Sequence, residues 1–124
     1  MRILVVDDSS TLRAMIRFHL KRAGGSEAFY VENGQEAVDW IRANGDPDLI
    51  LLDINMPVMN GLEFLRRRVG LGVSESVPII ILSTEGKEDD VQRGLDSGAR
   101  AYLRKPFTSP QLGEVIQRVL EPRT

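Results

Sequence analysis

The chain has 124 residues, of which 42% are hydrophobic and 27% charged, and a formal net charge of −2. This size and composition predict one globular domain, residues 1–124, with enough apolar side chains for a real core. The slight negative charge gives no sign of a surface for nucleic acid or membranes, and the lack of cysteine excludes disulfides and thiolate sites. No apolar run approaches the roughly 20 residues of a membrane span, and the N-terminus does not resemble a signal peptide, so we expect a cytoplasmic protein.

The first predicted strand, residues 3–6, is a continuous apolar run that ends in two acids, Asp7 and Asp8. The hydroxyl side chains of residues 9–11 can cap the helix that follows. The apolar side chains of this helix recur at helical spacing before two glycines end it, and they are Leu12, Met15, Ile16, Leu20 and Ala23. The only histidine, His19, lies in this helix, and we expect it to be a packing or surface residue because no second histidine could share a metal or proton with it.

A second strand is predicted at residues 28–31, and Asn33 then turns the chain into a helix with one apolar face. The third predicted strand, residues 49–52, is the most continuous apolar run, which is typical of a strand buried on both faces of a parallel sheet. It ends at Asp53. On this segment alone, Asp53 is either a ligand-binding group at the sheet edge or only the cap of a turn before Pro57.

A third helix is predicted to begin after Asn60, because Asn60 and Glu63 have the spacing of a capping box. Three of its apolar side chains are expected to face the core, and they are Leu62, Leu65 and Val69. The arginines at 66–68 could form an anion-binding patch. We expect them instead to be cations in the last helical turn, where the helix dipole favours positive charge.

The fourth predicted strand, residues 78–82, is again continuously apolar and ends in Ser83 and Thr84. The helix after it has only a thin apolar stripe and contains Gly94, so we expect a weakly held and movable element. Gly70-Leu71-Gly72 lacks the third glycine of a dinucleotide-binding loop, and Gly86-Lys87 lacks the upstream glycine and the following hydroxyl of a phosphate-binding loop.

A fifth, short strand is predicted at residues 101–103 and leads to Lys105. Thr108 or Ser109 caps a last helix, whose inward side chains are expected to be Leu112, Val115, Ile116, Val119 and Leu120. Five strands that alternate with five helices predict an α/β fold, a doubly wound five-stranded parallel sheet. The reason is that each crossover between parallel strands needs a helix, and these helices cover the faces of the sheet.

Polar groups follow four of the predicted strands, and they are Asp7 with Asp8, Asp53, Ser83 with Thr84, and Lys105. The carboxyl ends of parallel strands share one edge of the sheet, so we expect these groups to meet. Two like charges about 4 Å apart cost about 4 kcal/mol at an effective dielectric constant near 20. We expect Lys105 and a hard divalent cation to offset this repulsion, and oxygen-only ligands favour Mg²⁺. A metal-bound carboxylate that faces a lysine and a hydroxyl suits phosphoryl transfer.

These groups also belong to motifs that are specific in combination. The motifs are Val5-Val6-Asp7-Asp8-Ser9, Leu52-Asp53-Ile54-Asn55-Met56-Pro57 with Asn60-Gly61, Leu82-Ser83-Thr84-Glu85, and Gly98-Ala99-Arg100-Ala101-Tyr102 before Lys105-Pro106-Phe107. In these motifs, and along nearly the whole chain, the sequence resembles the receiver domains of two-component response regulators, and among them the single-domain, CheY-like chemotaxis type. The resemblance implies the flavodoxin-like receiver fold, a (βα)5 arrangement with strand order 2-1-3-4-5.

The resemblance also implies roles for the acidic residues. Asp53 would accept a phosphoryl group from a phosphohistidine of a sensor histidine kinase. Asp8 and Asp53 would bind Mg²⁺ directly together with the backbone carbonyl of Asn55, while Asp7 would act through water. Asn55 and Glu85 each lie two residues past a site residue, and they either line the path of the water that removes the phosphoryl group or only fill the rim of the site.

Further roles are implied for residues of the last two strands. Lys105 would pair with the phosphoryl oxygens, aimed by a cis peptide bond before Pro106. Ser83 would be the switch hydroxyl that bonds the phosphoryl group, where threonine is commoner in the family, and Tyr102 the aromatic residue that turns inward in response. The fourth helix, the fifth strand and the fifth helix would form the face that binds a downstream target protein.

We therefore expect a signalling switch that acts as a monomer and catalyses only its own phosphorylation and dephosphorylation. A free-standing chemotaxis-type regulator is the preferred interpretation, and a receiver excised from a larger regulator, or a phosphorelay intermediate, is the alternative. A metal-dependent aspartyl phosphatase is disfavoured because Asn55, and no acid, lies two residues after Asp53. An interaction domain that is never phosphorylated is disfavoured because every site residue is present.

Overall fold

The computed structural model describes residues 1–23, 27–54, 60–84 and 86–120. Strands alternate with helices along this path, as the sequence predicts. In chain order the elements are β1 (Arg2–Val6), α1 (Ser10–Ala23), β2 (Glu27–Val31), α2 (Gly34–Asn44), β3 (Leu49–Asp53), α3 (Gly61–Arg67), β4 (Ile79–Ser83), α4 (Glu88–Asp96), β5 (Ala101–Arg104) and α5 (Ser109–Leu120). All five predicted strands are confirmed, each to within one residue at either end.

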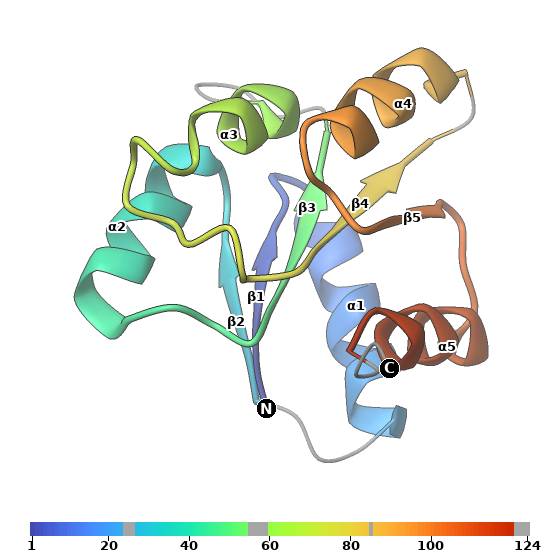
Figure 1. Ribbon diagram of the computed structural model, residues 1–124. Coiled ribbons are helices and arrows are strands. Elements are labelled where there is room, and N and C mark those ends of the chain that lie inside the picture. The colour runs from blue at the N-terminus through green and yellow to red at the C-terminus, as the bar shows by residue number, and fades with distance from the viewer. Residues whose placement is uncertain (24–26, 55–59, 85, 121–124) are drawn as a thin grey trace.

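The strands form one parallel sheet in the order β2-β1-β3-β4-β5 (Figure 1). This order is the one implied by the family resemblance. The register sets Val6 opposite Leu52, and it sets Asp53 opposite Leu82. The carboxyl ends of β1, β3 and β4 therefore lie side by side at one edge of the sheet.

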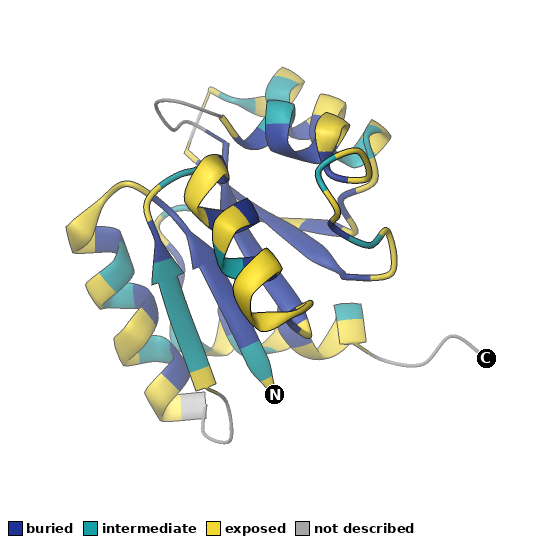
Figure 2. Cartoon of the chain, turned by 90° about the vertical axis from the view of Figure 1, so that its left-hand side faces the viewer, coloured by how far each residue is buried: buried dark blue, intermediate teal, exposed yellow. Residues whose placement is uncertain are grey.

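Helices cover both faces of the sheet (Figure 1). α2, α3 and α4 pack against one face, and α1 and α5 pack against the other, so that the core consists of two hydrophobic clusters. Successive side chains of a strand point to opposite faces, so a central strand needs apolar residues at every position. Leu51, for example, belongs to one cluster and Leu52 to the other. Figure 2 shows the central strands buried and the edge strand β2 only half-buried.

Three of the predicted helix caps are confirmed. The backbone amide of Leu12 donates to the Ser9 hydroxyl over 3.2 Å, and that of Glu63 donates to the Asn60 side chain over 2.9 Å. At the start of α5 the amide of residue 111 donates to the Thr108 hydroxyl over 3.2 Å. His19 is half-buried and packs against Phe107, which lies just before α5, as expected for a packing residue. The glycines predicted to end α1 lie outside the described residues.

Two predictions of inward-facing side chains are wrong. Val69 is 59% exposed and Leu120 is 37% exposed. α3 ends at Arg67, so Val69 no longer follows the helical spacing, and the buried Phe64 fills the core in its place. Leu120 is the last residue of α5, one turn beyond the buried Ile116.

The prediction for the arginine run is correct for Arg66 and Arg67, which lie in the last turn of α3, and wrong for Arg68. Arg68 is only 6% exposed. Its guanidinium lies 3.4 Å from the carbonyl oxygen of Val77 and 3.4 Å from that of Glu75, so it joins the end of α3 to the loop before β4. Burial lowers the pKa of Arg68, since desolvation disfavours the charged form.

α4 is attached to the sheet by little apolar surface, as predicted. Its buried residues are Val91 and Gly94, and Leu95 is only half-buried. Gly94 packs directly against the side chain of Ile81 in β4, and a Cβ atom at this position would collide with the Cδ1 atom of Ile81. The glycine therefore lets α4 approach the sheet closely. Within the described ranges, no helix combines the length and the apolar character needed to cross a membrane.

Candidate functional site

Three carboxylates meet where β1 and β3 end. One oxygen atom from each of Asp7, Asp8 and Asp53 lies within 4.8 Å of the others. Asp7 is completely buried, Asp53 is 6% exposed and Asp8 is exposed. β1 and β3 are neighbours in the sheet, so the acids that follow the two apolar runs are brought together by strand pairing alone.

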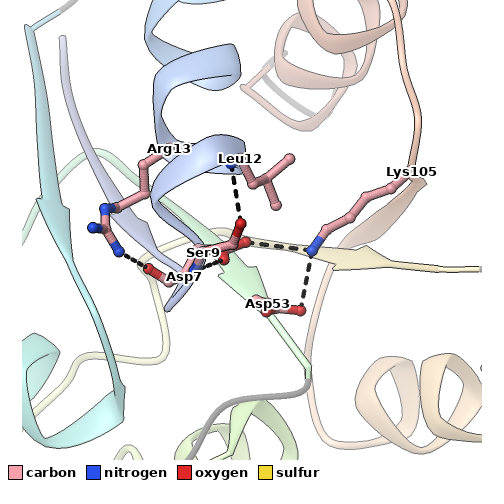
Figure 3. A network of polar contacts seen from close by, with 6 residues as sticks. All are labelled: Asp7, Ser9, Leu12, Arg13, Asp53 and Lys105. Carbon is pink, nitrogen blue, oxygen red and sulfur yellow. Dashed lines mark hydrogen bonds and ion pairs between the residues drawn. The ribbon is translucent and has the colours of Figure 1, made fainter.

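Lys105 lies against two of these carboxylates. Its Nζ atom is 3.3 Å from Oδ2 of Asp7 and 3.3 Å from Oδ1 of Asp53 (Figure 3). The backbone amide of Lys105 donates to the carbonyl of Ser83 over 2.6 Å, which fixes the end of β5 beside β4. The peptide bond between Lys105 and Pro106 is cis, as the family resemblance implied. The lysine side chain is 16% exposed, so water screens its attraction to the acids only in part.

Every polar atom of Asp7 has a partner. Its amide donates to the carbonyl of Val31 over 3.0 Å, and its Oδ1 atom accepts from the amide of Ser9 over 2.8 Å. Its Oδ2 atom faces Lys105, and its carbonyl accepts from Nη1 of Arg13 over 2.8 Å. Arg13 was not predicted to belong to the site, because it is part of no motif and its contact is with the backbone. Asp7 is therefore held rigidly.

Gly61 supports Asp53 from behind. A Cβ atom on Gly61 would collide with the carbonyl oxygen of Asp53 and lie 2.9 Å from the Cα atom of Ile54. The amide of Gly61 also donates to the carbonyl of Ile54 over 2.9 Å. The first residue of α3 thus packs on the backbone that carries Asp53, and only glycine fits there.

The cluster suits a divalent cation. Three carboxylates and one ammonium carry formal charges of −3 and +1, which leaves −2 among these four side chains. The donor atoms are all carboxylate oxygens, the ligand type that Mg²⁺ prefers. Asp8 is exposed, so one side of the cluster is open to water and solutes.

Ser83 and Tyr102 lie on the neighbouring strands β4 and β5. Ser83 is 4% exposed and Tyr102 is 50% exposed, so the tyrosine points outward in this structure. Both line a cavity of about 250 Å³ between these strands and α4. Asn55 and Glu85, which are expected either to line the path of the attacking water or to fill the rim of the site, lie outside the described residues, and so does the Asn55 carbonyl that is expected to bind Mg²⁺.

Comparison with known proteins identifies this arrangement. Residues 3–117 match the family model of the response regulator receiver domain. The chain belongs to this family. Receiver domains are the phospho-accepting switches of two-component signalling, and this chain is such a switch.

Relatives of this receiver domain include chemotaxis regulators. A chemotaxis protein CheY homolog of Campylobacter jejuni is 41% identical over 120 residues, which are 97% of this chain and 92% of the relative. The structure of chemotaxis protein CheY4 of Vibrio cholerae has a TM-score of 0.83 at 36% identity, covering 96% of this chain and 98% of that chain. The receiver domain of a sensor histidine kinase of Pseudomonas aeruginosa, solved with a magnesium ion coordinated in its active-site cleft, has a TM-score of 0.83 at 30% identity over 95% of both chains.

Proposed function

We propose that this receiver domain accepts a phosphoryl group on Asp53 from a phosphohistidine of a sensor histidine kinase. A carboxylate oxygen of Asp53 forms a bond to phosphorus as the bond between phosphorus and the histidine nitrogen breaks. That nitrogen keeps the electron pair and takes up a proton from water. The observation that carries the proposal is the position of the Lys105 ammonium, 3.3 Å from the Asp53 carboxylate within a cluster of three acids.

In the proposed site, Asp8, Asp53 and the backbone carbonyl of Asn55 hold Mg²⁺. When bound, the ion neutralises negative charge on the phosphoryl oxygens and on the carboxylates. Asp7 acts on the ion through water, and this is supported by its carboxylate being already engaged by Ser9 and Lys105. The magnesium ion in the related Pseudomonas aeruginosa receiver domain supports the same choice of metal.

Lys105 and Ser83 act on the phosphoryl group once it is attached. The ammonium pairs with one phosphoryl oxygen and the hydroxyl donates a hydrogen bond to another, so that both groups are drawn toward Asp53. Tyr102 then turns into the cavity of about 250 Å³ that it lines together with Ser83. This movement changes the face formed by α4, β5 and α5, through which we propose that a downstream target binds.

The wider biological role follows from the relatives. Several are chemotaxis regulators that match over nearly their whole length, which supports a role in chemotaxis. We propose that this receiver domain acts as a monomer in the cytoplasm, between a kinase and a target protein. In this role the chain catalyses only its own phosphorylation and dephosphorylation. Asn55 and Glu85 would set the lifetime of the phosphorylated state by lining the path of water, and substitution of both should change that lifetime if they do.

The decisive experiment is mass spectrometry of the intact chain after incubation with acetyl phosphate and Mg²⁺. The wild type should gain one phosphoryl group, and the gain should be lost when Mg²⁺ is chelated. Asp53→Ala should gain none, whereas Asp46→Ala, which removes an exposed acid from the loop before β3, should behave as wild type. Uptake by Asp53→Ala, or no uptake by the wild type, would refute the proposal.

A further inference from the structure

We infer that Arg13 is a positioning residue for the acidic turn that follows β1, and that it holds Asp8 in the place where Asp8 can bind a metal ion. The inference rests on the proposed function for the role of the metal. Its basis is the hydrogen bond of 2.8 Å from Nη1 of Arg13 to the carbonyl oxygen of Asp7 (Figure 3). Among the described residues of the site, Arg13 is the cation that binds backbone rather than a carboxylate of the cluster.

The Asp7 carbonyl belongs to the peptide unit that joins Asp7 to Asp8. This unit is planar, so fixing its oxygen also fixes the direction in which the chain continues to the Cα atom of Asp8. Asp7 is anchored by four contacts, whereas the Asp8 side chain is exposed. The location of the exposed acid therefore depends on the orientation of the peptide unit before it, and Arg13 holds that unit.

The other terminal nitrogen of the Arg13 guanidinium contacts a carboxylate next to β2. Nη2 of Arg13 lies 3.5 Å from Oε1 of Glu32, which directly follows β2. The side chain of Arg13 is 18% exposed and that of Glu32 is 60% exposed. The planar guanidinium thus spans the ends of β1 and β2. The partly buried bond to the Asp7 carbonyl is the stronger contact, because water screens the more exposed ion pair with Glu32.

Two opposite effects of Arg13 on metal binding can be separated by their sign. As a nearby positive charge, Arg13 repels a divalent cation, so its removal would tighten Mg²⁺ binding. As a brace for the acidic turn, it keeps the ligands in place, so its removal would weaken binding. Loss of a residue that orients a metal ligand typically weakens binding by about 10- to 100-fold. We therefore expect the loss of positioning to outweigh the loss of repulsion, so that removal of Arg13 weakens Mg²⁺ binding.

The test is titration calorimetry of the full chain with Mg²⁺ alone, using wild type, Arg13→Ala, Arg13→Lys and Arg13→Gln. We expect Arg13→Ala to weaken Mg²⁺ binding by about tenfold, and Arg13→Lys to recover part of the loss because the ammonium can still donate to the carbonyl. Arg13→Gln keeps a donor without the charge, and its binding should lie between the other two. Arg17→Ala is the matched control, since Arg17 lies one turn further along α1 and packs over the ring of Tyr30.

Amide hydrogen exchange without metal is a second measurement, and it distinguishes a local effect of Arg13 from a change in overall stability. In Arg13→Ala, exchange should quicken at the amide of Ser9, which donates to Asp7. It should stay at the wild-type rate at the amide of Ile50, which donates to Pro78 in the core of the sheet. Equal or tighter Mg²⁺ binding by Arg13→Ala, or unchanged exchange at Ser9, would overturn the inference alone. A wild type that binds no Mg²⁺ would overturn the proposed function and the inference with it.

Discussion

The Nζ atom of Lys105 lies 3.3 Å from Oδ1 of Asp53, although Asp53 ends β3 and Lys105 follows β5, which is not a neighbour of β3 in the sheet. The same ammonium is 3.3 Å from Oδ2 of Asp7. Before any metal binds, the Lys105 ammonium thus offsets part of the repulsion between two buried carboxylates. Removal of this charge should therefore lower the free energy of unfolding.

Lys105→Met should lower the free energy of unfolding by about 3 kcal/mol in the absence of metal, because breaking a largely buried ion pair leaves uncompensated charge. Urea unfolding with EDTA measures this loss. Added Mg²⁺ should restore part of it, since the ion supplies the missing positive charge. Lys21→Met, at an exposed position of α1, is the control and should change little. Equal effects of the two substitutions would contradict the assignment.

Gly61→Ala should cost about 2 to 3 kcal/mol, because the new Cβ atom collides with backbone atoms of Asp53 that cannot move independently of β3. The displacement should also slow phosphoryl uptake from acetyl phosphate. Gly113→Ala is the matched control, since nothing lies within 4 Å of a Cβ atom there and the change in a helix should stabilise by about 0.4 to 1 kcal/mol. A Gly61→Ala variant as stable as Gly113→Ala would show that the site tolerates the shift.

Gly94→Ala should destabilise the protein because its Cβ atom meets Cδ1 of Ile81. That atom is the end of a side chain, so the clash can be removed by Ile81→Val, which alone should cost about 0.5 to 1.5 kcal/mol. In the double variant the two changes should compensate, with a favourable coupling of at least about 0.5 kcal/mol in urea unfolding. Strict additivity would mean that α4 is not held at this distance by the pair.

Arg68→Met should leave stability within about 1 kcal/mol of wild type, because a buried charge replaced by an apolar side chain of similar size is often neutral. The ion pairs of the described part of the chain do not include Arg68. Its lowered pKa means that the folded state binds this proton less tightly than the unfolded chain does, so the charge costs stability at neutral pH. Arg68→Ala should instead lose about 2 to 3 kcal/mol through the cavity it leaves. Equal losses in the two variants would show that the bonds to the loop carbonyls dominate.

Phosphorylation should change the protection of α4 and β5. A shift of the switch from rare to dominant needs about 5.5 kcal/mol, and charge-assisted bonds from Ser83 and Lys105 supply roughly 1.5 to 3 kcal/mol each. Beryllium fluoride with Mg²⁺ should therefore change the rate of amide exchange of residues 86–104, but without a complete shift of the switch. The change should be larger once a target is bound. Asp53→Ala should show no difference. Identical protection in the wild type would refute a switch in this segment.

The amino-acid sequence by itself predicted the five strands, their alternation with helices and the edge at which the polar groups meet. It could do so because strand burial on two faces demands continuous apolar runs, and a charge can follow such a run only where the strand leaves the core. The helix caps at Ser9, Asn60 and Thr108 were also readable, because each depends on a side chain and an amide only three residues apart. These are local rules that hold whatever surrounds the segment.

Only the tertiary structure decided the features that depend on packing between distant elements. The buried position of Arg68, the exposure of Val69 and the space filled by Gly61 follow from how α3 and its loop meet the sheet. The bond from Arg13 to a backbone carbonyl leaves no pattern in the sequence, since any residue has such a carbonyl. Spacing along the chain reports which groups share an edge, but the distances between them are set by strand order, twist and side-chain packing.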